Sequence, residues 1–291
     1  MDPRTIWLHL YDTPFRLDYV VAGGVKTRYL EAGEGPPLLL LHGTGGHLEA
    51  YARNLRGLSQ RFRVIAYDMV GHGFSDKPDR PYTVDFYVEH LLSLMDTLGL
   101  SRAHLSGESL GGWVAAWMAA HHPERVDRLV LNTPGNITAK PDVMARIREL
   151  SLRAVREASP ATIRERLEFL MHDKGQVTEE LVQVRLAIYT QPGFLKAMEN
   201  ILVLQDPEVR QRYTWGPEWC GRIRARTLIL WTDHDPTGTL EEGRLLQSWI
   251  PGSELRVIHG AGHWPQWEKP EEFNLLHEEF LRGGNHGSEN R

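Results

Sequence analysis

Short strand-like segments alternate along the chain with segments that have apolar residues at helical spacing. The strand-like segments lie at residues 37–41, 62–67, 101–106, 126–131, 227–231 and 254–258. The helical segments lie at residues 49–59, 84–98, 112–120, 240–249 and 271–281. This alternation predicts an α/β fold, a mostly parallel sheet with helices on both faces. Residues 15–22 and 26–31 flank Gly23-Gly24 and predict a β-hairpin, so we expect eight strands in all.

One long stretch interrupts the alternation. Residues 135–217 lie between two predicted strands and show only helical patterns, broken at Pro160, Gly175 and Pro192. Because an ordinary crossover is far shorter, we expect a helical cap inserted after the sixth strand, over the sheet edge where ligands bind in open α/β folds. The chain then divides into core residues 1–134 and 218–282, cap residues 135–217, and a flexible tail at 283–291.

The pentapeptide Gly107-Glu108-Ser109-Leu110-Gly111 stands between a predicted strand and a predicted helix. A serine at such a sharp turn projects its hydroxyl out of the sheet, and glycines on either side remove Cβ atoms that would clash there. The following helix directs unpaired N–H groups toward a reacting carbonyl. Ser109 is therefore our candidate nucleophile.

A serine nucleophile needs a base, and the base needs an acid that orients it. His263 lies in a glycine-flanked loop after the last predicted strand, whereas His259 still belongs to the strand and is interpreted as structural. Asp235 is favoured over Asp233 as the orienting acid because it lies further out on its loop. The order Ser109, Asp235, His263 is the one expected for an α/β-hydrolase.

The backbone N–H groups of Thr44 and Leu110 are the candidate oxyanion hole, since one follows the third strand and the other follows the nucleophile. The spacing of His42, His47 and His72 matches no metal-ligand motif, so neither a metal nor a cofactor is expected.

Composition narrows the function to chemistry on a small molecule. The 291 residues carry a net charge of −5 without a basic run, which argues against a nucleic-acid or anionic membrane partner. No apolar run is long enough to span a bilayer, and no signal peptide precedes the first strand. The single cysteine, Cys220, fits a reducing compartment, so we expect a cytoplasmic protein.

From about residue 15 to residue 281 the chain resembles the α/β-hydrolase superfamily. The matching features are His42-Gly43-Thr44-Gly45, residues 68–76, Gly107-Glu108-Ser109-Leu110-Gly111-Gly112, Asp235 and His263. Within that superfamily, residues 177–185 and 262–274 look very like the meta-cleavage product hydrolases, which hydrolyse C–C bonds in aromatic degradation. This resemblance implies that Arg185 binds the substrate's dienoate carboxylate and that Trp264 lines the pocket. It also implies assembly into a homo-oligomer.

Two departures from that family concern positions that hold the substrate. Glu108 stands where the family usually has asparagine, and Gly45-Gly46-His47 with Ala50 replaces a Gly-Pro-Gly run followed by asparagine. Gly43 and Glu108 thus occupy substrate-binding positions, but an ionised Glu108 would repel a substrate carboxylate.

The sequence predicts a serine hydrolase that cleaves a C–C bond of a 2-hydroxy-6-oxo-dienoate formed by aromatic ring fission. The second hypothesis is a carboxylesterase or lactonase with the same triad, which Glu108 and Ala50 favour and Arg185 and Trp264 oppose. A third is a binding protein on this fold, which would not need a complete triad. Epoxide hydrolases and haloalkane dehalogenases are disfavoured because the elbow position holds Ser109, where those families resemble an aspartate-nucleophile pattern.

Overall fold

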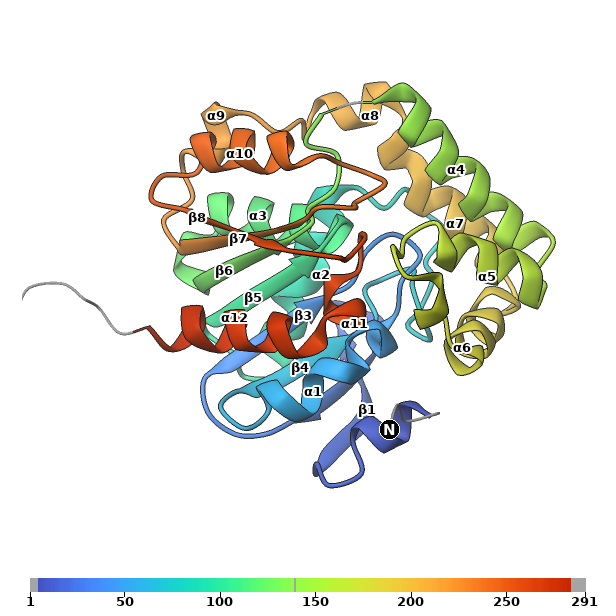
Figure 1. Ribbon diagram of the computed structural model, residues 1–291, viewed down its shortest axis with the longest axis horizontal. Coiled ribbons are helices and arrows are strands. Elements are labelled where there is room, and N and C mark those ends of the chain that lie inside the picture. The colour runs from blue at the N-terminus through green and yellow to red at the C-terminus, as the bar shows by residue number, and fades with distance from the viewer. Residues whose placement is uncertain (1–4, 139, 284–291) are drawn as a thin grey trace, which may run out of the picture.

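The computed structural model describes residues 5–138 and 140–283, and Figure 1 shows their arrangement. Eight strands form one sheet in the order β1-β2-β4-β3-β5-β6-β7-β8. The strands are β1 (Phe15–Ala22), β2 (Val25–Ala32), β3 (Pro37–Leu41), β4 (Arg63–Tyr67), β5 (Ala103–Glu108), β6 (Val126–Asn132), β7 (Arg226–Thr232) and β8 (Glu254–Ile258). The hairpin β1–β2 joins β4 in antiparallel fashion, and every other pairing is parallel. The predicted mostly parallel sheet is confirmed.

Alternating side chains of β3 show how both faces of the sheet are covered. Leu38 and Leu40 belong to the core under α1 (Ala52–Leu58) and α12 (Pro270–Arg282), which lie together on one side in Figure 1. Leu39 and Leu41 belong to the opposite core, with α2 (Val84–Thr97), α3 (Leu110–His121) and α10 (Leu240–Trp249). A strand buried on both faces is apolar at every position, which is why this segment lacks alternation.

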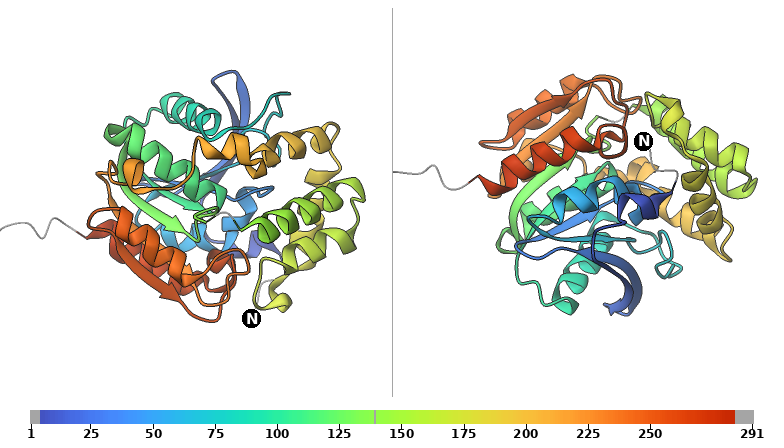
Figure 2. Two further views of the ribbon diagram at one scale, coloured as in Figure 1. Left: turned by 90° about the horizontal axis from the view of Figure 1, so that it is seen from above. Right: turned by 60° about the horizontal axis from the view of Figure 1, so that its bottom comes forward.

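Six α-helices lie between β6 and β7 in the described part of the chain. They are α4 (Pro141–Arg156), α5 (Pro160–Glu168), α6 (Glu179–Tyr189), α7 (Phe194–Ile201), α8 (Pro207–Gln211) and α9 (Pro217–Cys220). The first five gather beside the sheet at one end of the molecule, at the right in Figure 1 and in both views of Figure 2. The helical insertion after the sixth strand thus has the form that the sequence predicted.

Local sequence explains where the cap helices begin. Proline opens α4, α5 and α8, at a position where the missing N–H costs nothing. Ser159 and Thr178 accept hydrogen bonds from first-turn N–H groups and so cap α5 and α6. These two helices carry Arg166 and Arg185, so the N-caps help to fix the backbone positions from which both side chains extend.

The sequence prediction needs adjustment at three short segments. The helix expected over 49–59 is a 3-10 turn at Leu48–Tyr51 followed by α1. A short helix α11 (Pro265–Glu268) follows His263 directly, and another 3-10 turn at Ile6–His9 precedes β1. The expected flexible tail lies, apart from Gly283, outside the described residues. Within those residues, no helix combines the length and apolarity that crossing a membrane would require.

Candidate active site

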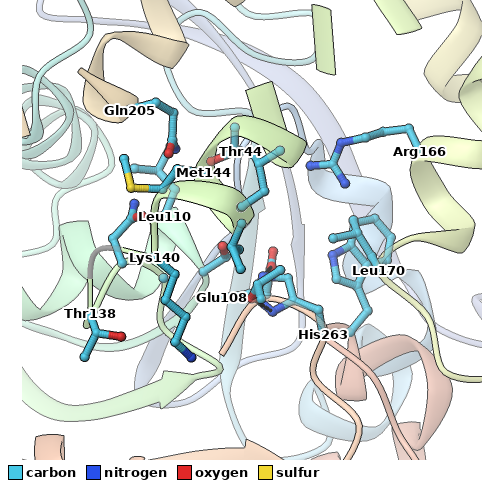
Figure 3. A pocket seen from close by; sticks show the side chains of 18 residues that line it. Thr44, Glu108, Leu110, Thr138, Lys140, Met144, Arg166, Leu170, Gln205 and His263 are labelled. Atoms are coloured by element: carbon cyan, nitrogen blue, oxygen red, sulfur yellow. Dashed lines mark hydrogen bonds and ion pairs between the residues drawn. The ribbon is translucent and has the colours of Figure 1, made fainter. Parts of the chain in front are cut away.

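Loops from the C-terminal ends of five parallel strands meet the cap at one cavity, shown in Figure 3. The core side contributes Gly43, Thr44, Glu108, Ser109, Leu110, Thr237, His263 and Trp264. The cap side contributes Lys140, Val143, Met144, Ile147, Arg166, Leu170 and Gln205. The open space is only about 40 Å³, enough for a few water molecules. Any larger substrate must therefore move side chains or the cap as it binds.

The turn at Ser109 is strained in the way a nucleophile elbow requires. Ser109 has φ 52° and ψ −115°, which a residue with a side chain rarely adopts. Its N–H donates to the Asn132 carbonyl at 3.1 Å, and Gly135 N–H donates to the Ser109 carbonyl at 3.1 Å. A Cβ on Gly107 would stand 2.2 Å from the Gly111 carbonyl oxygen, so glycine is needed there. Helix α3 begins at the next residue, Leu110, and directs its first N–H groups to this point.

His263 is held from several sides. Its Nδ1 lies 2.9 Å from Asp235 Oδ2, and Thr237 Oγ1 lies 3.0 Å from the same nitrogen. Thr237 also donates to Asp235 Oδ1 at 2.8 Å, while the His263 backbone N–H donates to the Leu170 carbonyl of the cap at 2.7 Å. Burial opposes charge on the imidazole, but Asp235 and then Glu108 outweigh it, and the pKa of His263 is raised above 6.5.

Asp233, the competing acid, has a different partner. Its Oδ2 lies 3.1 Å from His259 Nδ1, and its Oδ1 accepts from Gly260 N–H at 2.8 Å. His259 lies just beyond the end of β8, and its side chain is 78% exposed, so its expected position on the strand was wrong. The structure brings Asp235, and not Asp233, to His263.

The other imidazole nitrogen of His263 faces Glu108. Nε2 lies 3.2 Å from Glu108 Oε1, and no hydrogen bond joins Ser109 to His263 in the described part of the chain. Glu108 is buried, and its Oε2 has no hydrogen-bond partner. Burial raises the pKa of Glu108 to about 7, against the opposing effect of His263. The ring is thus placed between two carboxylates that both attract a proton.

Gly43 makes room for the Glu108 carboxylate. A Cβ at Gly43 would stand 2.5 Å from Glu108 Oε2 and 2.7 Å from Oε1. Since Glu108 is buried, its carboxyl end has little freedom to retreat. The absence of a side chain at Gly43, next to Thr44, therefore leaves space for the side chain of Glu108, which precedes the candidate nucleophile.

Arg185 is a completely buried cation on α6. None of its three guanidinium nitrogens has a hydrogen-bond partner, and its Cζ stands 5.2 Å from the Trp264 ring and 5.9 Å from the Tyr189 ring. Burial lowers its pKa, partly offset by Tyr189 and Glu108. It is not among the residues that line the cavity, but its guanidinium stands over the ring of Trp264, which does line it. A guanidinium in this state is ready to bind an anion that enters the site.

The sequence did not predict several polar residues that line the cavity: Asn136, Thr138, Lys140, Arg166, Gln205 and Thr237. Thr237 follows Asp235 by two positions, so the Asp-Pro-Thr turn is a signal that could have found it. Arg166 is one of several arginines on cap helices, and nothing in its spacing indicates that it lines the cavity.

The histidines near the third strand are structural in their contacts. His42 Nε2 accepts from Met69 N–H at 3.1 Å, Nδ1 lies 2.9 Å from the Gly43 carbonyl, and the ring packs 4.9 Å from the His72 ring. Burial lowers the pKa of both histidines. In the described residues no three His, Cys, Asp or Glu side chains are grouped so that they could hold a metal ion.

Comparison with known proteins places this site in a family. The model of the α/β-hydrolase fold matches residues 36–270. A 2-hydroxy-6-oxo-6-phenylhexa-2,4-dienoate hydrolase of Comamonas testosteroni is 36% identical over 265 residues, which cover 87% of this chain and 90% of that protein. A 2-hydroxymuconate semialdehyde hydrolase of a Pseudomonas species is 33% identical over 272 residues, covering 90% and 92%.

A solved meta-cleavage product hydrolase of Pseudomonas fluorescens superposes with a TM-score of 0.76 at 33% identity. The match covers 91% of this chain and 97% of that one. Similarity at this level over nearly the whole length extends well beyond a shared fold, so the chain belongs to the α/β-hydrolases and, within them, to the meta-cleavage product hydrolases.

Proposed function

We propose that this protein hydrolyses a C–C bond of a 2-hydroxy-6-oxo-dienoate with Ser109 as nucleophile, His263 as base and Asp235 as the acid that orients the base. The observation that carries the proposal is the contact of His263 Nδ1 with Asp235, 2.9 Å long, beside a strained Ser109 in one cavity. That geometry supports serine chemistry, and the relatives named above support the reaction class.

The reaction begins with a proton shift in the substrate. His263 takes the proton of the 2-hydroxyl and returns it to C5, so the dienol becomes a ketone and C5 can later leave as a stabilised carbanion. Ser109 then gives its proton to His263 Nε2 and attacks the C6 carbonyl. The tetrahedral intermediate breaks the C5–C6 bond, C5 takes the proton back, and water releases the acyl group from Ser109. Asp235 stabilises the imidazolium that forms in each step.

The oxyanion of the tetrahedral intermediate needs donors that are already in place. The backbone N–H groups of Thr44 and Leu110 are our candidates, because both residues line the cavity beside Ser109. Removal of one such donor typically raises a barrier by about 3 kcal/mol.

Arg185, Trp264, Gly43 and Glu108 are proposed to surround the dienoate end of the substrate. The unpartnered guanidinium of Arg185 supports a role in binding its carboxylate. A pKa of about 7 leaves a large fraction of Glu108 neutral near pH 7, which weakens its repulsion of a second carboxylate. Since Nε2 has only one lone pair, Glu108 must give up its contact with His263 before Ser109 can react.

The second candidate function is hydrolysis of small esters or lactones with the same triad. Glu108 favours it, because a buried carboxylate beside the nucleophile suits an uncharged substrate better than an anionic one. Esters also need no prior ketonisation, so they test the triad without the C–C chemistry.

Stopped-flow absorbance with 2-hydroxy-6-oxo-6-phenylhexadienoate tests the proposal. We expect the dienolate band to decay rapidly with the wild type, to persist with Ser109→Ala, and to require much higher enzyme concentration for saturation with Arg185→Ala. Loss of the serine should cost about 10⁴- to 10⁶-fold in kcat, as in other serine triads. Fast hydrolysis of p-nitrophenyl esters without turnover of the dienoate would contradict C–C hydrolysis and support the ester alternative.

We propose further that the protein acts on a small-molecule substrate in the cytoplasm and that it assembles as a homo-oligomer. Size-exclusion chromatography with light scattering tests the assembly, and a monomer at micromolar concentration would contradict it.

A further inference from the structure

Arg166 is the second buried guanidinium of the site, and unlike Arg185 it faces the cavity directly. It starts on α5, and Figure 3 shows its side chain reaching from the cap toward the middle of the pocket. The residue is 3% exposed. Burial lowers its pKa to about 10, so it remains a cation at neutral pH.

The hydrogen bonds of Arg166 are incomplete. Nε donates to Ser151 Oγ of α4 at 3.2 Å, which fixes the direction of the side chain. Nη1 is buried without a hydrogen-bond partner, and no carboxylate in the described part of the chain forms an ion pair with this group. A buried cation without a partner costs free energy that an anion bound in the cavity would offset.

Lys140, the other cation that lines this cavity, differs in this respect. Its Nζ lies 3.0 Å from Glu242 Oε2, so its charge is already paired within the protein. The remaining cap residues of the lining are uncharged: Val143, Met144, Ile147, Leu170 and Gln205. Among the cap residues described in this lining, Arg166 is therefore the cation without a carboxylate partner.

The position of Arg166 indicates which end of the substrate this side chain contacts. The proposed function, on which this inference rests, assigns the dienoate carboxylate to Arg185, whose guanidinium stands over the Trp264 ring and is not part of the cavity lining. The other end is the acyl group that Ser109 holds as an acyl-enzyme, and because Ser109 and Arg166 line the same cavity, we assign that group to the space that Arg166 faces.

We propose that Arg166 is a specificity-determining residue that binds a carboxylate on the acyl portion of the substrate. The preferred substrates are then ring-fission products with a carboxylate at both ends, rather than products that end in a methyl or phenyl group. Such an acyl carboxylate can accept hydrogen bonds from the free Nη1 and replace the missing counter-ion.

Two substrate pairs test this proposal. The first compares 2-hydroxy-6-oxononadienedioate with 2-hydroxy-6-oxononadienoate, whose acyl chains have the same length and differ only in a terminal carboxylate against a terminal methyl. The second compares mono-p-nitrophenyl glutarate with p-nitrophenyl pentanoate, which differ in the same way in an ester. For the wild type we expect kcat/KM to favour the acyl carboxylate about tenfold or more in each pair that is turned over.

Arg166→Met should lower kcat/KM for the carboxylate-bearing partner about 10- to 100-fold, mainly through KM, and leave the other partner nearly unchanged or improved. Arg166→Lys should retain part of the preference. The matched control is Arg210→Met, because Arg210 is also a buried cap arginine but lines a different surface cavity. That control should leave both ratios unchanged.

Equal losses for both partners in Arg166→Met, or a wild type that prefers the methyl-ended partner, would overturn the proposal. A measurement without any variant guards against misfolding: glutarate should inhibit ester hydrolysis by the wild type at least tenfold more strongly than pentanoate, and equal inhibition would refute the role of Arg166. If neither dienoate is turned over but the ester pair shows the Arg166-dependent preference, C–C hydrolysis fails while the acyl-carboxylate site stands.

Discussion

Each ring nitrogen of His263 lies next to a carboxylate, but the two carboxylates have opposite consequences for the ring. At Nδ1, Asp235 belongs to a turn that also includes Thr237, and its contact fixes the tautomer that leaves Nε2 free to act as a base. At Nε2, Glu108 makes the contact that the proposed mechanism gives to the Ser109 hydroxyl. In that mechanism one carboxylate prepares the base, and the other restrains it.

The difference arises from where each carboxylate is attached. Asp235 projects from a loop after β7, where Thr237 satisfies one of its oxygens. Glu108 is the last residue of β5, fully buried, with one oxygen unpartnered. An incompletely satisfied buried carboxylate has a raised pKa and readily shares a proton with the imidazole. Position relative to the ring, rather than residue type, decides the role.

The largest expected effect comes from the Nδ1 side. Asp235→Asn should reduce kcat about 10³- to 10⁴-fold for dienoate and ester alike, because the amide no longer stabilises the imidazolium and favours the wrong tautomer. Steady-state kinetics with both substrates would measure it.

Asp233→Asn is the matched control for that variant, two residues away on the same loop, because Asp233 pairs with the exposed His259. It should change kcat less than twofold. If both substitutions had the same effect, the assignment of Asp235 would fail.

An intermediate effect is expected on the Nε2 side. Glu108→Asn removes the charge and shortens the side chain, so His263 should lose the part of its raised pKa that Glu108 causes. A raised pKa keeps the base protonated as the pH falls, so lowering it moves the acidic limb of kcat/KM to lower pH. Ester hydrolysis at pH 6 should accelerate about tenfold, with little change at pH 8, as pH–rate profiles would show.

Glu108→Gln separates the effect of the negative charge from the effect of side-chain length, because the amide is neutral and retains the length of the side chain. We expect the same shift of the acidic limb with a smaller gain in rate, because the amide still contacts Nε2. Profiles that coincide with the wild type in both variants would mean that Glu108 does not restrain His263.

The smallest expected effect concerns the support of Asp235. Thr237→Val removes the hydroxyl that donates to Asp235 Oδ1 while retaining the branched shape. One such hydrogen bond contributes about 1 kcal/mol, so kcat should fall roughly fivefold without a change in KM. Thr239→Val, on the neighbouring helix cap, should lower the melting temperature and leave kcat unchanged. Equal kinetic effects of the two substitutions would contradict a specific role for Thr237.

The parts of this molecule that could be predicted from sequence are those that local pattern determines. Strands such as β3 are apolar at every position because both faces are covered, and the glycine at 107 is required by the Gly111 carbonyl, four residues away. Chain order then suffices to place Asp235 and His263 at the same sheet edge, since all the parallel strands end there.

Contacts between the cap and the core could not be predicted in this way. Whether Arg166 faces the cavity depends on the packing of α5 against α4. The burial of Arg185 depends on Trp264, which is distant in sequence, as well as on Tyr189, one turn further along α6. The sequence identified Glu108 as unusual but placed it near the substrate carboxylate. Its contact with His263 depends on the space above Gly43, which only the fold creates.

The protonation of His263 tests the comparison most directly. Proton NMR of the low-field ring N–H signals, recorded as a function of pH for the wild type and for Glu108→Gln, reports the pKa of this imidazole; Asp235→Asn identifies its signal by removing it. The account predicts a wild-type pKa above 6.5 that is lower in Glu108→Gln. A His263 that titrates at the same pH in both proteins would contradict the claim that a second carboxylate holds the catalytic base.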